Sequence, residues 1–166
     1  MKNKHPFLRF LLFAAEILLL WLLQATPGLM PALFGTKPFL LLAGALAIAS
    51  CEEAAPSVIF GAVCGVLADL SAGGTVGFFA VAFTLVCFAQ ASLLGTYLNR
   101  NLPTAAVVSL GSSAAVLSLY FLLFRAFAGA PDGAALYFFG YLPRVLYTAM
   151  TFVPLYGLNR LITKRL

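Results

Sequence analysis

The chain has 166 residues, of which 63% are hydrophobic and 9% are charged, and its mean hydropathy is +1.03. A soluble domain is nearer half apolar and a quarter charged, so these residues cannot cover a water-facing surface. The composition therefore excludes a soluble globular protein. It predicts a single membrane-embedded domain, residues 1–166, with no catalytic domain outside the bilayer.

The net charge of +5 is concentrated near the two ends of the chain, where basic residues flank apolar runs. These residues are Lys2, Lys4, Arg9, Arg160, Lys164 and Arg165. Such placement is typical of the charges that orient membrane proteins, so we predict contact with membrane lipid and no binding of nucleic acid. With both termini in the cytoplasm, these six residues and Arg100 lie on the cytoplasmic side, whereas Lys37, Arg125 and Arg144 lie on the outer side. The excess of basic residues on the cytoplasmic side predicts an N-in, C-in orientation.

Apolar runs separated by turn residues predict the helices in chain order. The expected ranges are 6–25, 38–51, 57–70, 76–98, 103–127 and 141–162. This series predicts an all-α integral membrane protein, a compact bundle of about six transmembrane helices of about 20 residues each. The second and third runs have only 14 residues. They reach about 21 Å against a hydrocarbon core of about 30 Å, so we expect them to tilt little, to thin the bilayer or to form a re-entrant hairpin.

Glu16 interrupts the first apolar run, which otherwise resembles a signal peptide. A charged side chain at the centre of a membrane helix costs about 2.5–3.5 kcal/mol on the insertion scale. We therefore expect an uncleaved helix with Glu16 facing the bundle interior or a partner. Two interpretations remain open: the carboxyl holds helices in register, or it contacts the partner directly.

A stripe of small residues marks the third run, where Gly61, Gly65 and Asp69 follow one another at intervals of four. Residues four apart share one face of a helix, and glycines on that face let another helix approach closely. The stripe is predicted to be a docking or core-packing surface that ends in a carboxylate near the outer leaflet. The alternative is that Asp69 caps a helix end or the Gly73–Gly74 turn.

Arg144 follows Pro143 at the start of the last run. It is expected to extend its guanidinium to the membrane surface, or to pair with Asp69, because both lie toward the outer leaflet. Serines in the fifth run, among them Ser109, Ser113 and Ser118, are expected to form hydrogen bonds across helices.

Catalytic motifs are missing from the sequence. His5, the single histidine, lies in the basic N-terminal segment, and the nucleotide-binding, hydrolase and zinc-protease motifs are absent. Cys51, Cys64 and Cys87 lack ligand spacing and are expected as buried small hydrophobes. We therefore predict no enzyme activity, no catalytic residues, no cofactor and no metal. A small ligand within the bundle stays an alternative.

Several segments match the pattern of a known family. In chain order they are Ala15–Glu16 with Leu22–Thr26, Lys37–Leu42, Gly61–Asp69 with Gly77 and Thr84–Leu85, and Tyr141–Arg144 before a basic tail. In these segments the chain resembles the family of the rod shape-determining protein MreD. The resemblance covers nearly the whole length.

This resemblance implies a non-enzymatic scaffold of the cell-elongation complex in the bacterial inner membrane. Such a scaffold binds the bitopic protein MreC and is linked through it to MreB, the glycosyltransferase RodA and a penicillin-binding transpeptidase in lateral peptidoglycan synthesis. Glu16, Gly61, Gly65, Asp69 and Arg144 are the expected partner-binding or helix-packing residues. MreD also resembles in fold the substrate-binding components of energy-coupling-factor vitamin transporters, which makes such a component the alternative. The first helix lacks the A-x-x-x-A pattern expected of that alternative.

Overall fold

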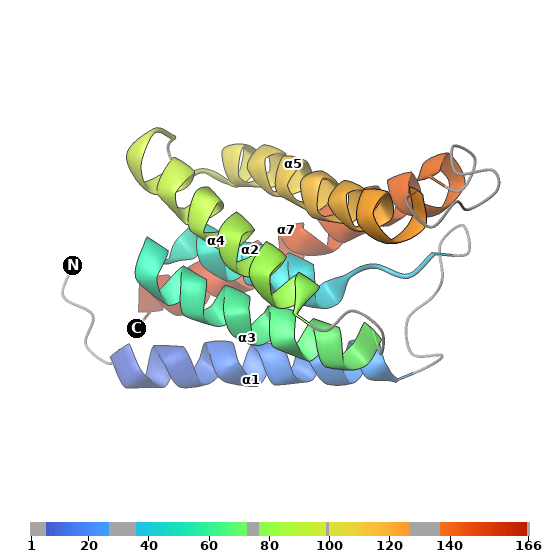
Figure 1. The fold of residues 1–166 in the computed structure, drawn as a ribbon. Coiled ribbons are helices and arrows are strands. Elements are labelled where there is room, and N and C mark those ends of the chain that lie inside the picture. Colours follow the sequence, from blue (N-terminus) through green and yellow to red (C-terminus); the bar gives the residue numbers. More distant parts are fainter. Residues whose placement is uncertain (1–5, 27–35, 73–76, 99, 127–136, 166) are drawn as a thin grey trace.

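The computed structural model describes residues 6–26, 36–72, 77–98, 100–126 and 137–165, and these form a helical bundle (Figure 1). The α-helices are α1 (Pro6–Ala25), α2 (Leu40–Cys51), α3 (Ala54–Ala72), α4 (Phe78–Thr96), α5 (Leu102–Phe121) and α7 (Leu142–Arg165). Two π-helical turns, η1 (Leu122–Ala126) and η2 (Tyr137–Tyr141), extend α5 and precede α7. The six predicted helices are thus present among the described residues.

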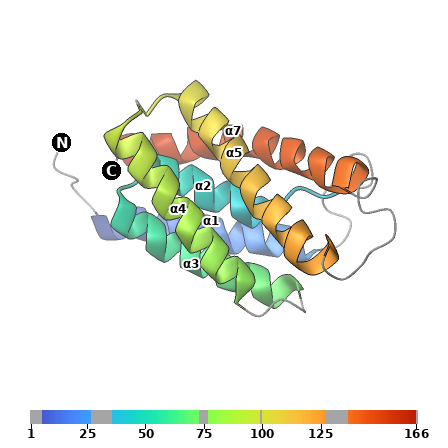
Figure 2. The same cartoon turned by 45° about the horizontal axis from the view of Figure 1, so that its top comes forward.

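Helix α2 lies at the centre of the bundle and contacts α1, α3, α4, α5 and α7 (Figures 1 and 2). Every residue from Leu40 to Ser50 is buried. Apolar residues cover all sides of this helix, the pattern of a helix with no solvent-facing side. Small residues allow the neighbours to approach closely: a Cβ added at Gly44 would lie 2.5 Å from Cδ1 of Leu20 on α1.

The central helix is much shorter than the helices around it. With 12 residues, α2 is about 18 Å long, whereas the 19–24 residues of its neighbours correspond to about 29–36 Å. The C-terminal end of α2 lies beside the start of α3, which begins at Ala54, so it is the N-terminal end that stops inside the bundle. A recess opens beside each end of α2.

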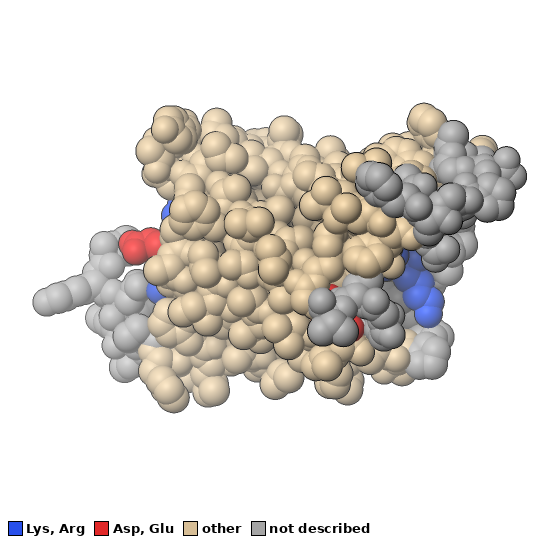
Figure 3. Space-filling view, in the orientation of Figure 1, with Lys and Arg blue, Asp and Glu red and all other residues tan. Residues whose placement is uncertain are grey.

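In the part of the chain that the structure describes, four helical segments are long and apolar enough to cross a membrane: Phe7–Ala25, Ala54–Ser71, Phe78–Thr96 and Leu102–Phe124. In Figure 3 the flank of the molecule carries uncharged side chains, and the visible charges lie toward its two ends. Helix α1 begins at the end of the bundle where α7 finishes (Figure 1). The chain is therefore an α-helical membrane protein. The start of its first described helix and the end of its last described helix lie at the same end of the bundle.

The third helix differs from its prediction. It begins at Ala54, three residues before the expected start, and continues to Ala72. Pro56 does not end it, because the first turn of a helix has no intrahelical partner for its N–H groups and tolerates proline. At 19 residues α3 is long enough to span, so the prediction of a short third helix was wrong. The short second helix is confirmed.

Candidate functional site

The glycine stripe of α3 packs against α4. A Cβ built at Gly65 would lie 2.5 Å from the Cα of Ala80 and still closer to the carbonyl oxygen of Phe79. At Gly61 the added atom would lie 3.0 Å from the Cβ of Cys87. The backbones of the two helices touch here, which is the arrangement that small residues permit in membrane bundles. Of the two predicted roles for this stripe, the structure favours core packing.

Asp69, the next residue of the stripe, binds the beginning of α4. Its carboxylate accepts hydrogen bonds from the backbone N–H groups of Gly77 at 3.1 Å, Phe79 at 3.1 Å and Ala80 at 3.0 Å. These N–H groups lie in the first turn, where α4 offers no partner of its own, and a negative charge is favourable at that end of a helix. The alternative interpretation of Asp69 as a cap fits these contacts, with α4 as the helix that it caps.

We expect Asp69→Ala to destabilise the bundle by about 2 kcal/mol, since loss of a capping side chain costs about 0.5–2 kcal/mol and three donors lose an acceptor together. Thermal unfolding of the purified protein in detergent measures this change. Asp69→Asn keeps one oxygen acceptor and should lose less. An Asp69→Ala protein as stable as the parent would contradict the capping role.

Glu16 points into the bundle, as predicted. Both carboxylate oxygens are buried, and they lie beside the side-chain amide of Asn159 on α7 without completing a hydrogen bond to a described residue. Asn159 is fully buried. The structure therefore places Glu16 between α1 and α7, while a direct contact with a partner stays a prediction.

Gln90 joins α4 to the central helix. It is fully buried, and its amide nitrogen donates to the carbonyl oxygen of Leu46 at 3.1 Å and to the hydroxyl of Ser50 at 2.7 Å. Gln90 was not among the predicted contact residues, although a glutamine in the middle of an apolar run is itself a signal. Its role is to fix the position of α4 against α2.

Charged residues gather around the C-terminal end of α2. Arg9 and Glu52 form a buried salt bridge with 3.0 Å between Nη2 and Oε2. Burial raises the pKa of the Glu52 carboxyl, while the charges of Arg9 and Arg100 oppose that rise. Arg100 donates to the carbonyl oxygen of Cys51 at 2.7 Å. This contact satisfies one of the last carbonyls of α2, which have no partner within the helix.

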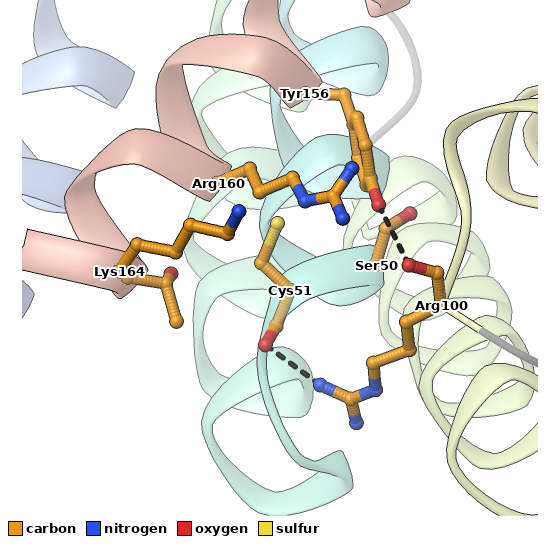
Figure 4. Close-up of a pocket in the computed structure, with 7 residues that line it drawn as sticks. Ser50, Cys51, Arg100, Tyr156, Arg160 and Lys164 are labelled. Carbon is orange, nitrogen blue, oxygen red and sulfur yellow. Dashed lines mark hydrogen bonds between the residues drawn. The ribbon is translucent and has the colours of Figure 1, made fainter. Parts of the chain in front are cut away.

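The recess beside this end, the C-side recess, has a volume of about 180 Å³. It is lined by residues that include Cys51, Arg100, Tyr156, Arg160 and Lys164 (Figure 4). Figure 4 shows the side chains of Arg160 and Lys164 extending from α7 toward Cys51, and the Tyr156 hydroxyl donating to the carbonyl oxygen of Arg100 at 3.3 Å. The recess is positively charged, but it opens onto the negative end of the α2 dipole.

A larger recess, the N-side recess, lies beyond the N-terminal end of α2 and has a volume of about 580 Å³. Its lining includes Trp21, Gln24, Lys37, Phe39, Tyr120 and Arg144. The guanidinium of Arg144 lies over the ring of Phe39, with 5.1 Å between Cζ and the ring centroid. Arg144 is therefore partly buried against an aromatic ring, which differs from the predicted extension to the surface, and no ion pair with Asp69 forms.

The five predicted site residues do not meet at one place. Gly61, Gly65 and Asp69 share the α3–α4 contact, Glu16 faces α7, and Arg144 lines the N-side recess. Within the described ranges, no three His, Cys, Asp or Glu side chains lie close enough together to hold a metal ion. The aromatic and polar lining of the N-side recess was not predicted, because its members come from distant parts of the chain.

Comparison of this chain with protein families, with curated proteins and with solved structures finds no match.

Proposed function

We propose that this chain is a non-enzymatic scaffold of the bacterial rod-shape complex, similar to MreD, in the inner membrane with both termini in the cytoplasm. It binds an MreC-like bitopic protein and through it supports MreB, RodA and a penicillin-binding transpeptidase in lateral wall synthesis. The resemblance of its segments to MreD motivates the proposal, and the distribution of polar groups in the bundle supports it.

The supporting observation is that several polar side chains inside the described bundle join one helix to another. Asp69 caps α4, Gln90 binds α2, and Glu52 pairs with Arg9. Interactions of this kind hold the helices in one arrangement and leave their outer faces apolar. Large apolar side chains are exposed along these faces, for example Leu18 at 58% on α1 and Val107 at 73% on α5. Contacts with other membrane helices can form on such faces.

Co-purification from detergent tests this proposal. The chain is expressed in a rod-shaped bacterium with a tagged MreC-like bitopic protein, and an unrelated bitopic protein with the same tag is the control. We expect the chain to co-purify with the first protein and not with the second, and depletion of the chain to turn rods into spheres. Absence of association together with normal cell shape after depletion would end this proposal.

A substrate-binding component of a vitamin transporter is the second candidate, and the N-side recess favours it. A volume of about 580 Å³ lies in the range of small-molecule sites, about 300–1,000 Å³. The first helix counts against this candidate, since the helix that would contact an energy-coupling subunit carries only Ala14, Ala15 and Ala25. Submicromolar binding of a vitamin to the purified protein, without association with the bitopic partner, would reverse the order of the two candidates.

A further inference from the structure

The N-side recess carries positive charge without an acidic side chain in its described lining. Lys37 and Arg144 are the charged residues that line it, and aromatic side chains form much of the rest. Lys37 is exposed, whereas Arg144 is partly buried. The acid next to this lining in sequence, Asp69, is bound to the first turn of α4. The recess is therefore an electropositive cavity at the end of a membrane bundle.

Arg144 lacks an anionic partner among the described residues. Its Nε atom is buried and has no hydrogen-bond partner in the described part of the chain. Its guanidinium lies over the ring of Phe39, and its other electrostatic neighbours are the uncharged phenols of Tyr120 and Tyr141. A partly buried guanidinium without a counter-charge is costly near a membrane interior. Phe39 compensates a part of that cost, since a cation over an aromatic face contributes about 0.5–2 kcal/mol. A bound anion would supply the missing charge.

The beginning of α2 adds to the positive potential of the recess. Phe39, which precedes the first turn, lines the cavity, and the N-terminal end of a helix favours anions. The side-chain oxygen Oε1 of Gln24 on α1 accepts a hydrogen bond from the backbone N–H of Leu41 at 3.1 Å. This orientation leaves the Gln24 amide nitrogen as a further donor at the edge of the recess.

The C-side recess shows why charge alone does not make an anion site. It also has cations in its lining, Arg100, Arg160 and Lys164. There, however, Arg100 is bound to the Cys51 carbonyl, and the carboxylates of Glu52 and Glu53 line the adjoining cavity. Glu52 is paired with Arg9, so Glu53 and the negative end of α2 offset only a part of the positive charge, and that helix end disfavours an anion beside it. The N-side recess has the positive end of the same helix, and no acidic side chain is found among the described residues that line it.

We propose that the N-side recess binds an organic oxyanion with a flat apolar body. The oxyanion lies between Arg144 and Lys37, and the body lies against Trp21 and Tyr120, while Phe39 stays under the Arg144 guanidinium. The phosphate oxyanion itself is offered both by a soluble organic phosphate and by the headgroup of an anionic lipid. This inference goes beyond the scaffold function and does not depend on it, because binding needs no partner protein.

The fluorescence of Trp21 measures this binding directly, since Trp21 is the single tryptophan of the chain and lines the recess. The probe is phenyl phosphate, titrated into the full chain in phosphatidylcholine nanodiscs, with uncharged benzyl alcohol as the matched compound. We expect a saturable change with phenyl phosphate that weakens with added salt, and no saturable change with benzyl alcohol. A second titration in nanodiscs that contain phosphatidylglycerol separates the two sources of the ligand. Weaker apparent binding there assigns the site to the lipid headgroup, and unchanged binding assigns it to a soluble anion.

Arg144→Gln is expected to weaken phenyl phosphate binding at least tenfold, and Lys37→Gln about threefold. Each substitution removes one positively charged side chain that binds the oxyanion. Lys37 is exposed, so its variant tests the site even where loss of Arg144 disturbs the packing on Phe39. Arg160→Gln in the C-side recess is the matched control and should bind as the parent does. The proposal is overturned by equal binding in the parent and both N-side variants, by equal binding of benzyl alcohol, or by no saturable change in the parent.

Discussion

A Gly65→Leu variant is expected to lose the folded bundle. The first side-chain atom at this position already falls 2.5 Å from the Cα of Ala80, and Phe79 presents a carbonyl oxygen closer still. Both obstacles are backbone atoms of α4, so a rotamer change in a neighbour cannot remove them. Overpacking of a tight contact costs about 1–3 kcal/mol or more, and here we expect the upper part of that range. Gly65→Ala should be destabilised in the same direction and by less.

Size-exclusion chromatography and thermal unfolding in detergent measure this effect. Gly111 on α5 provides the matched control, because a Cβ there meets nothing within 4 Å. Gly111→Ala should be as stable as the parent or slightly more stable, since alanine favours a helix by about 1 kcal/mol over glycine. A monodisperse Gly65→Leu protein with the unfolding temperature of the parent would mean that the stripe faces lipid.

Breaking the pair between Arg9 and Glu52 is expected to have the second large effect. The two side chains are 10% and 4% exposed, respectively, so removal of one leaves the other as a buried charge. Such a change costs about 3–5 kcal/mol in folded proteins. Arg9→Ala and Glu52→Ala should therefore each lower the unfolding temperature in detergent strongly. The double variant should be more stable than the sum of the two changes predicts, because neither charge then remains unpaired.

Glu53 is the control for this pair. It neighbours Glu52 in sequence but is exposed, and an exposed charge contributes little to stability. Glu53→Ala should unfold at the temperature of the parent. If Glu52→Ala behaved like Glu53→Ala, the pair would not stabilise the join between α1 and the α2–α3 corner.

Helices could be predicted from the sequence because apolar composition and turn residues are local signals. The range of α1 is confirmed at both ends, and the breaks at Glu52–Glu53 and before Leu102 separate helices as expected. The start of α3 was wrong because Pro56 was taken to end a break, whereas it lies inside the first turn. The Gly73–Gly74 turn and the Gly129–Gly133 loop lie outside the described residues.

The central place of α2 could not be predicted in the same way. Its length was noted, but a short apolar helix can thin the bilayer, re-enter it or lie inside a bundle, and composition does not separate these cases. The pairings Arg9 with Glu52 and Gln90 with Ser50 join residues 43 and 40 positions apart. They follow from the packing of helices, which a single sequence does not reveal.

The serines of α5 illustrate the same limit. Ser118 does bond across the chain, to the Tyr137 hydroxyl at 2.7 Å. Ser109 and Ser113 instead donate to carbonyls of their own helix, Ala106 and Leu110. The prediction was wrong for these two because a serine in a helix can bond the preceding turn without any neighbour.

The shortness of α2 has a consequence for synthesis at the ribosome. A 12-residue apolar segment is shorter than the about 20 residues that leave the translocon as an independent span, and its polar ends need partners supplied by other helices. At its beginning the Phe39 N–H donates to the Thr148 hydroxyl of α7 at 3.1 Å, and α7 is made more than 90 residues after α2. The bonding of the innermost helix is thus completed only after α7 has been made, so a chain truncated before α7 should emerge with its centre unassembled and exposed to quality-control proteases.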